Sequence, residues 1–100
     1  MAVFYIGSYD IHNMQEFMNY PPKVIGLLSR YGGEVLASSI EAISLEGTAK
    51  TMNAIIKFPS MESALAMYND PEYQQKIKPI RLNSTSNCTM VLVEEFNKEA

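Results

Sequence analysis

Four side chains in this sequence have the chemistry expected of a catalyst, and they lie far apart: His12, Asp70, Tyr73 and Arg81. His12 is the only histidine and the one side chain that ordinarily titrates near neutral pH, so it is a candidate general base. Tyr73 and Arg81 are candidates for holding the oxygen atoms of a substrate. No motif of fixed spacing joins the four residues, so the sequence does not fix a reaction.

Each candidate also has a purely structural explanation. A lone histidine in a turn is most often solvated, and we favour that interpretation for His12. Asp70 precedes Pro71 and Glu72, an order typical of a capped helix start, which accounts for both carboxylates. Arg81 either binds a ligand carboxylate or forms an ion pair with Asp70 or Glu72, and the ion pair is the favoured interpretation.

Cysteine, metal and cofactor chemistry have little support. Cys88, the only cysteine, could face His12 across neighbouring strands as a thiol–imidazole pair, but a buried structural cysteine is the favoured interpretation. One histidine and one cysteine without ligand spacing predict no metal site. Gly32 and Gly33 follow a helix pattern instead of preceding one, so we predict no phosphate-binding loop and no cofactor.

Tyrosines are the best candidates for a ligand site, because each offers an aromatic wall and one polar group. We expect a small, partly apolar ligand in a cleft between a sheet and its helices, with Tyr9 among the lining candidates. The residues predicted to bind this ligand are Tyr5, Tyr31, Tyr68, Tyr73 and Arg81.

Length, composition and charge limit the class of protein. The chain has 100 residues, 47% hydrophobic and 19% charged, as expected of one soluble globular domain. The net charge of −3 offers no basic surface for nucleic acid. No apolar run approaches the roughly 20 residues that span a bilayer, so no membrane partner is expected. The N-terminus lacks the basic segment of a signal peptide, and with a single cysteine this predicts a reducing, cytoplasmic setting.

The hydrophobic pattern predicts the order strand, helix, strand, strand, helix, strand. Pro21 and Pro22 interrupt the first helix, Ser60 caps the second, and Pro79 ends it after a break at residues 69–71. A polar stretch, 81–87, is expected to be a loop, and 96–100 a frayed tail of the single domain 1–100. The predicted elements are strands 2–9, 34–45, 51–58 and 89–96 and helices 13–31 and 60–79.

This order is that of the ferredoxin-like βαββαβ fold, an α+β class with an antiparallel sheet. Right-handed crossovers place the first strand between the third and the fourth, with both helices on one face of the sheet. The other face also carries apolar side chains, and a second copy of the same sheet is the simplest cover. We therefore predict a homodimer with its sheets face to face.

The same topology gathers polar side chains at one end of the domain. The first two strands end there and the next two begin there, so the cleft is expected to open at this polar end. The residues expected to gather there are Asp10, His12, Glu46, Lys50, Asp70, Glu72, Tyr73, Arg81 and Cys88.

Five segments carry a family resemblance: Tyr31 to Gly33, Leu45 to Gly47, Phe58 to Ala64, Tyr68 to Gln74 and Met90 to Glu94. They resemble the family called domain of unknown function 1330, and the likeness covers nearly the whole chain. The resemblance implies a dimeric α+β barrel, related to the cofactor-independent antibiotic-biosynthesis monooxygenases and the stress-responsive barrel proteins. It implies no activity, because the family has no established common reaction.

Two departures from the family pattern concern charge. The family often has arginine near the positions of Ser38 and Met52, and this chain does not. The arginine after the second helix is retained as Arg81, with one extra residue before it. If the family's arginines bind an anionic ligand, the site in this chain is weakened or altered.

Three functions are open at this point. Analogy with the barrel relatives favours a cofactor-independent enzyme, oxygenase- or isomerase-like, that relies on His12, Tyr73, Arg81 and Asp70. A non-catalytic ligand-binding or stress-related module would instead show no enclosed pocket and no strongly shifted pKa at the polar end. A purely structural dimer would have a filled cleft.

Overall fold

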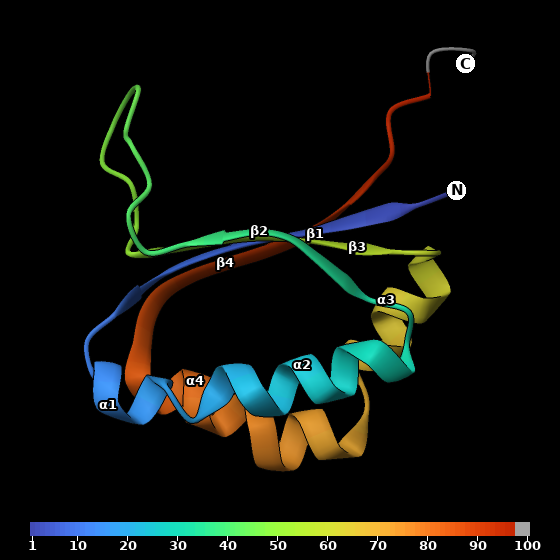
Figure 1. Cartoon of the computed structure of the whole chain (residues 1–100), viewed down its shortest axis with the longest axis horizontal. Coiled ribbons are helices and arrows are strands. Elements are labelled where there is room, and N and C mark those ends of the chain that lie inside the picture. The colour runs from blue at the N-terminus through green and yellow to red at the C-terminus, as the bar shows by residue number, and fades with distance from the viewer. Residues whose placement is uncertain (98–100) are drawn as a thin grey trace.

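The computed structural model describes residues 1–97, which form a sheet layer above a helical layer (Figure 1). The order of elements is the predicted one, with each helical stretch divided into shorter pieces. In chain order the elements are β1 (Val3–Ile11), α1 (Met14–Phe17), α2 (Tyr20–Arg30), β2 (Glu34–Ser39), β3 (Met52–Phe58), α3 (Met61–Tyr68), the π-helical turn η1 (Tyr73–Ile77), α4 (Lys78–Ser84) and β4 (Thr85–Glu94).

The four strands form one antiparallel sheet in the order β2-β3-β1-β4. β1 is central and pairs with both β3 and β4, with Tyr5 opposite Ile56 on one side and Leu92 on the other. This arrangement confirms the predicted α+β ferredoxin-like fold. Alternate residues of a strand point to opposite faces, so Tyr5, Gly7 and Tyr9 share the face that looks toward the helices.

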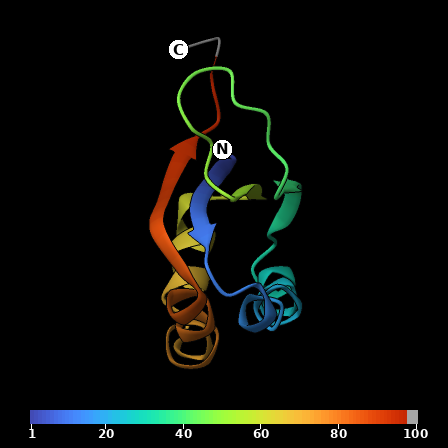
Figure 2. The ribbon, with the colours of Figure 1, turned by 90° about the vertical axis from the view of Figure 1, so that its left-hand side faces the viewer.

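The helices cover only that face of the sheet, with α2 beneath β2 and α4 beneath β4 (Figure 2). The predicted interruption of the first helix is confirmed, because α1 ends at Phe17 and α2 restarts at Tyr20 with Pro21 and Pro22 in its first turn. Proline is tolerated there because the first turn has no intrahelical partner for its missing N–H.

The second helical stretch begins as predicted and ends differently. Ser60 caps α3, its Oγ accepting a hydrogen bond from the Ser63 amide at 3.1 Å. Pro79 does not end the helix. It lies in the first turn of α4, directly after η1, and the helix continues to Ser84. The wide turn before Pro79 relieves the clash that a proline ring makes with the carbonyl four residues earlier. β4 therefore begins at Thr85, where a loop was predicted.

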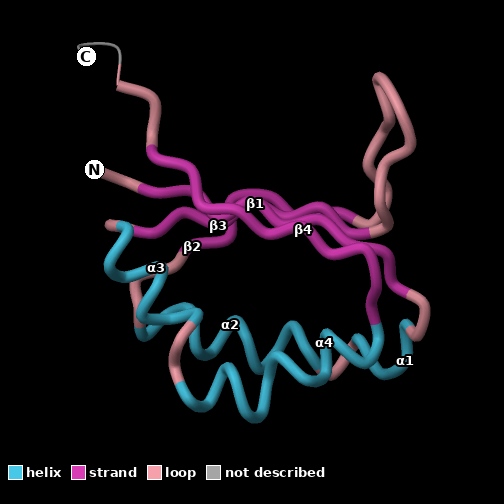
Figure 3. Tube along the Cα trace, turned by 180° about the vertical axis from the view of Figure 1, so that it is seen from behind, coloured by secondary structure: helices cyan, strands magenta, loops and turns pink. Residues whose placement is uncertain are grey.

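The predicted strand 34–45 is also shorter in the structure, because β2 ends at Ser39. Residues 40–51 form a long loop that rises on the side of the sheet opposite the helices (Figure 3). Two of its apolar side chains, Ile43 and Leu45, are 87% and 95% exposed.

The sheet face away from the helices is uncovered in the single chain. Its central side chains are apolar and partly exposed, and they include Ile6, Ile55, Val91 and Val93. The core lies on the other side, where Val3, Phe58, Leu27 and Ile77 are almost completely buried. None of the helices in the described part of the chain is long and apolar enough to cross a membrane. The last three residues of the tail predicted for 96–100 lie outside the described residues.

Candidate functional site

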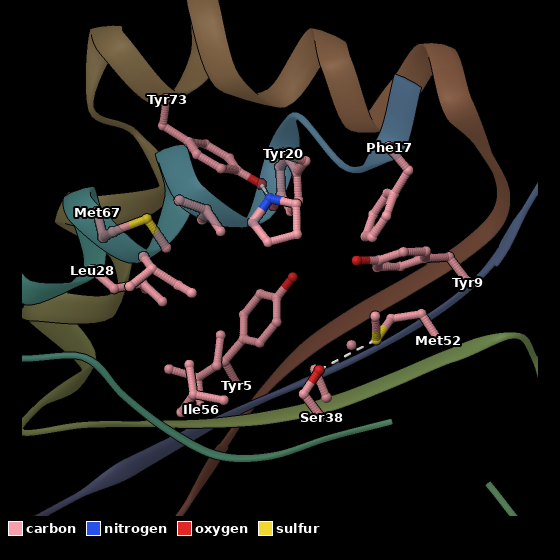
Figure 4. Close-up of a pocket in the computed structure, with 16 residues that line it drawn as sticks. Tyr5, Tyr9, Phe17, Tyr20, Leu28, Ser38, Met52, Ile56, Met67 and Tyr73 are labelled. Atoms are coloured by element: carbon pink, nitrogen blue, oxygen red, sulfur yellow. Dashed lines mark hydrogen bonds between the residues drawn. The ribbon is translucent and has the colours of Figure 1, made fainter. Parts of the chain in front are cut away.

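A cavity of about 190 Å³ lies between the sheet and the helices (Figure 4). Its floor is the inner face of β1 and β3, and its roof is α1, α2 and η1. Ile25 of α2 and Val35 of β2 line it and are themselves exposed, so the mouth opens between α2 and the edge strand β2. The lining side chains are almost entirely apolar or aromatic: Tyr5, Gly7, Tyr9, Phe17, Tyr20, Pro21, Val24, Ile25, Leu28, Val35, Ser38, Met52, Ala54, Ile56, Met67 and Tyr73.

Four tyrosine hydroxyls supply most of the polarity of this cavity. Tyr20 and Tyr73 share a hydrogen bond of 2.9 Å between their hydroxyl oxygens. The Tyr5 and Tyr9 hydroxyls point into the same space (Figure 4), and the Tyr5 hydroxyl donates to Met90 Sδ at 2.7 Å. Burial raises the pKa of Tyr5, Tyr9 and Tyr20 above the usual range of a phenol, so these groups are neutral at pH 7.

Gly7 makes room for the ring of Tyr5. The two residues lie on the same face of β1, and a Cβ added to Gly7 would come within 2.9 Å of Tyr5 Cε1. Real Cβ atoms do not approach carbon so closely, so any larger residue would push the ring away. The glycine therefore sets where one wall of the cavity stands.

Arg81 lies beside the tyrosines and is 2% exposed. Its guanidinium carbon is 5.9 Å from the centre of the Tyr9 ring, and Nη1 donates to Cys88 Sγ at 3.2 Å. Burial opposes the charged form, but Tyr73 and Tyr20 act in the other direction, and the pKa is raised above that of a free arginine. Arg81 is thus a buried cation behind the tyrosines, next to Tyr9, and it does not itself line the cavity.

The predicted ion pair between Arg81 and Asp70 or Glu72 is wrong. Asp70 and Arg81 are eleven positions apart in this mostly helical stretch, about 16 Å along the axis. Asp70 instead accepts a hydrogen bond from the Tyr31 hydroxyl at 2.5 Å, and Glu72 pairs with Arg30 at 2.7 Å. Both contacts lie at the C-terminal end of α2. Asp70 and Glu72 come to this place because α3, which precedes them, runs from the sheet down to the helical layer (Figure 1).

The other predicted site residues are also divided between locations. Tyr5, Tyr9 and Tyr73 line the cavity, whereas Tyr68 lines a second pocket of about 270 Å³ beside Met90 and Leu92. Tyr31 lies at the far end of α2, outside both linings.

His12 is exposed in the turn after β1 and does not line the cavity. Cys88 is exposed, not buried as favoured, and its sulfur contacts Arg81 instead of an imidazole.

Part of the predicted polar end exists. Asp10 accepts hydrogen bonds from the Asn87 side chain at 2.9 Å and the Thr51 amide at 3.3 Å, and these bonds lower the pKa of its carboxyl. Lys50 reaches Thr89 at 3.1 Å. These contacts join the ends of three strands on the surface and do not belong to the cavity lining.

The sequence missed Tyr20 as a site residue. Its position directly before Pro21 and Pro22 predicted a residue pushed out of the helix, yet Tyr20 begins α2 and is 6% exposed. Phe17, Pro21 and Leu28 form an apolar stripe at helical spacing along the predicted helix 13–31, and all three line the cavity. Tyr20 lies between Phe17 and Pro21 of this stripe, and that position was the signal in the sequence that could have identified it as a cavity residue.

Ser38 and Met52, the two positions near which the family resemblance suggests arginine, both line the cavity. The Ser38 hydroxyl faces Met52 Sδ at 3.5 Å (Figure 4). The cavity wall near β2 and β3 is therefore uncharged in this chain. Among residues 1–97, no three His, Cys, Asp or Glu side chains are grouped so that they could hold a metal ion.

The model of the family described as domain of unknown function DUF1330 matches residues 2–96. The chain belongs to this family. The resemblance seen in the sequence is confirmed, and the family description assigns no activity. Comparison with the curated proteins found no match.

Solved structures similar to this member of DUF1330 share its fold at low sequence identity. A protein of unknown function from Rhodopseudomonas palustris superposes with a TM-score of 0.80 at 15% identity, covering 96% of this chain and 83% of that one. A NIPSNAP-like domain protein from Burkholderia xenovorans gives 0.65 at 10% identity, with 97% and 87% covered. A dimeric protein of unknown function with a ferredoxin-like fold from Bacteroides fragilis gives 0.66 at 10%, with 94% and 96% covered.

Proposed function

We propose that this protein binds one small, mainly apolar molecule in the cavity between the sheet and the helices. The observation that carries the proposal is the cavity itself, about 190 Å³ of apolar-walled space with a few tyrosine hydroxyls at one side. An apolar cavity of roughly 150 Å³ is large enough to bind benzene. The ligand is accordingly about the size of one substituted ring.

Binding is favoured over catalysis because the cavity lining holds no carboxylate and no imidazole. A general base must come within hydrogen-bond reach of the proton that it removes. His12 and Asp70, the bases predicted from the sequence, lie outside the lining. A ligand-binding module therefore fits this chain better than an oxygenase or isomerase. The expectation that such a module would have no pocket and no strongly shifted pKa does not hold, because the cavity is present and burial raises the pKa of its tyrosines.

The test is an NMR titration of the ¹⁵N-labelled protein with toluene. We expect saturable shifts in the amides of β1, β3 and α2 around the cavity. Ala54 lies on the cavity floor, so Ala54→Phe should fill the space and abolish these shifts. The matched control is Ala66→Phe, on the exposed side of α3, which should bind toluene like the wild type. Unsaturated, scattered shifts, or equal binding by both variants, would refute the proposal.

Catalysis is a second candidate, and one observation favours it. Tyrosine hydroxyls backed by a buried cation are suited to stabilise an oxygen that gains negative charge, as in an enolate. If the protein stabilises an enolate, it should speed the exchange of hydrogen for deuterium at the carbon atoms next to the carbonyl of phenylacetone in D₂O. Water is the base in this exchange. Tyr73→Phe should slow the exchange. If the wild-type protein gives the same rate as buffer alone, this catalytic function is excluded.

We further propose that two copies pair through the uncovered sheet face. The support is the row of partly exposed apolar side chains Ile6, Ile55, Val91 and Val93 on that face. The loop 40–51 rises on the same side of the sheet (Figure 3), and it contains the exposed apolar residues Ile43 and Leu45. The similar protein from Bacteroides fragilis is described as dimeric.

A further inference from the structure

The charge of Arg81 has no partner of opposite charge among the residues that the structure describes. The side chain is 2% exposed, and its Nε atom is buried without a hydrogen-bond acceptor. Within residues 1–97 the ion pair joins Arg30 to Glu72 and does not involve Arg81. A buried charge is costly unless it is paired, so this site lacks an anion.

The neighbouring tyrosines supply dipoles but no compensating charge. Tyr5, Tyr9 and Tyr20 are protonated at neutral pH, because burial disfavours their ionised forms. Cys88 accepts one hydrogen bond from Nη1 and lies at the surface, where water competes for the interaction. The cation therefore creates a positive potential at the polar end of an otherwise apolar cavity.

The two buried tyrosines beside Arg81 can carry this potential into the cavity. Tyr73 and Tyr20 interact electrostatically with the Arg81 guanidinium, and their hydroxyls share a 2.9 Å hydrogen bond in which either can be the donor. When Tyr73 donates, the Tyr20 hydroxyl proton is free for an anionic oxygen. Both tyrosines line the cavity. Such a chain polarises each successive donor, so its free end is a strong site for an anionic oxygen.

We propose that the ligand of this cavity is a small carboxylic acid, bound as its carboxylate at the tyrosine end with its apolar body toward Val24 and Leu28. The carboxylate accepts from Tyr20, and Arg81 behind Tyr73 supplies the opposite charge. This inference rests on the proposed binding function and adds the chemical class of the ligand. It also gives a role to the buried arginine behind a cavity whose walls are uncharged.

The experiment compares phenylacetate with phenylacetamide, two probes of nearly the same shape that differ in charge. Calorimetric or NMR titration at pH 7 should give the wild type at least about tenfold higher affinity for phenylacetate, the usual gain when a hydrogen bond involves a charged group. Arg81→Met should bring the two affinities together. Arg30→Met removes the same charge at the exposed end of α2 and should keep the preference.

The outcomes separate this inference from the binding function. Equal affinity for the two probes, or a preference for the amide, would overturn the carboxylate inference while toluene binding still supports the cavity. A wild type that binds neither probe but binds toluene also overturns it. Failure of toluene to bind would instead overturn the binding function itself.

Two further variants keep the inference testable if Arg81→Met does not fold. Tyr20→Phe removes the proposed donor with little change in shape, and it should lower phenylacetate affinity more than phenylacetamide affinity. Cys88→Ser should retain the preference, because the sulfur is not the anion that the site requires. Loss of the preference in Cys88→Ser, with Tyr20→Phe unaffected, would assign the charge balance to the thiolate and overturn the proposal.

Discussion

At the scale of single residues, the hydroxyl of Tyr31 ties the end of α2 to Asp70, in the short connection between α3 and η1. This hydrogen bond, with a second from the Glu72 amide, lowers the pKa of the Asp70 carboxyl below its ordinary value of 3.8. A carboxyl whose pKa is lower in the folded than in the unfolded state stabilises the fold fully above its unfolded-state pKa. This stabilisation is lost as the pH falls from the unfolded-state pKa through the folded-state pKa.

Tyr31→Phe is therefore expected to destabilise the protein in a pH-dependent way. The loss in the free energy of unfolding should be full at pH 6 to 7 and should shrink as the pH falls below 3.8 through the lowered pKa of Asp70. Urea denaturation at a series of pH values measures it. Asp70→Asn is the control background. In it, Tyr31→Phe should lower the free energy of unfolding by the same amount at every pH. In the wild-type background, a destabilisation that does not shrink below pH 3.8 would contradict the role given to the Tyr31–Asp70 hydrogen bond.

Single residues were also where the sequence predicted the site least well. Tyr5 and Tyr73, which were expected near a ligand, line the same cavity, because a tyrosine is an informative residue type where it is buried. Arg81 is buried against the Tyr9 ring but does not line the cavity. Asp70 was placed at the wrong end. Its helix-capping role was local and visible in the sequence, but its neighbours depend on the direction of α3, which tertiary packing decides.

At the scale of elements, local signals predicted starts better than ends. The Ser60 cap and the proline-started α2 involve contacts within about one turn, so the sequence contains all their partners. Pro79 was misread because a proline normally stops a helix, and the wide turn η1 that accommodates it is not encoded by any one residue. The shortening of β2 likewise follows from its exposure at the sheet edge.

Within β1, the pairing of Gly7 with the Tyr5 ring gives a prediction about cavity shape. Gly7→Ala places a methyl group where the ring now lies, so the ring must turn into the cavity. We expect toluene affinity to fall several-fold and stability to fall by about 1–3 kcal/mol, as for other overpacked sites. NMR titration and thermal unfolding measure the two effects.

Ser8→Ala is the matched control, because Ser8 is the next residue of β1 and faces away from the cavity. It should bind toluene like the wild type. Unchanged toluene affinity in Gly7→Ala would show that the position of the Tyr5 ring does not define the cavity wall.

At the scale of the whole molecule, the uncovered sheet face predicts the assembly. Ile6 is 41% exposed at the centre of that face, on the central strand. In a dimer paired through the sheets, Ile6→Glu would bury an unpaired charge and should convert the dimer to a monomer. Sedimentation equilibrium at micromolar concentration should give twice the 11.2 kDa chain mass for the wild type and the single chain mass for the variant.

Leu82→Glu is the control for charge alone, because Leu82 is exposed on α4 in the helical layer. It should remain a dimer. A wild type that sediments only as a monomer, or dissociation by Leu82→Glu and not by Ile6→Glu, would show that the sheet face is not the interface.

The π-helical turn η1 has a consequence for how this family is compared by sequence. In an uninterrupted α-helix, the eight steps from Tyr73 to Arg81 turn by about 800°, roughly 80° beyond two full turns. Both side chains are nevertheless buried, because the wider turn of η1 brings them round to the same side of the helix. If shorter homologues lack the residue that η1 takes up, the gap belongs inside this helix. An alignment that places the gap in a later loop would then pair Arg81 with the wrong residue.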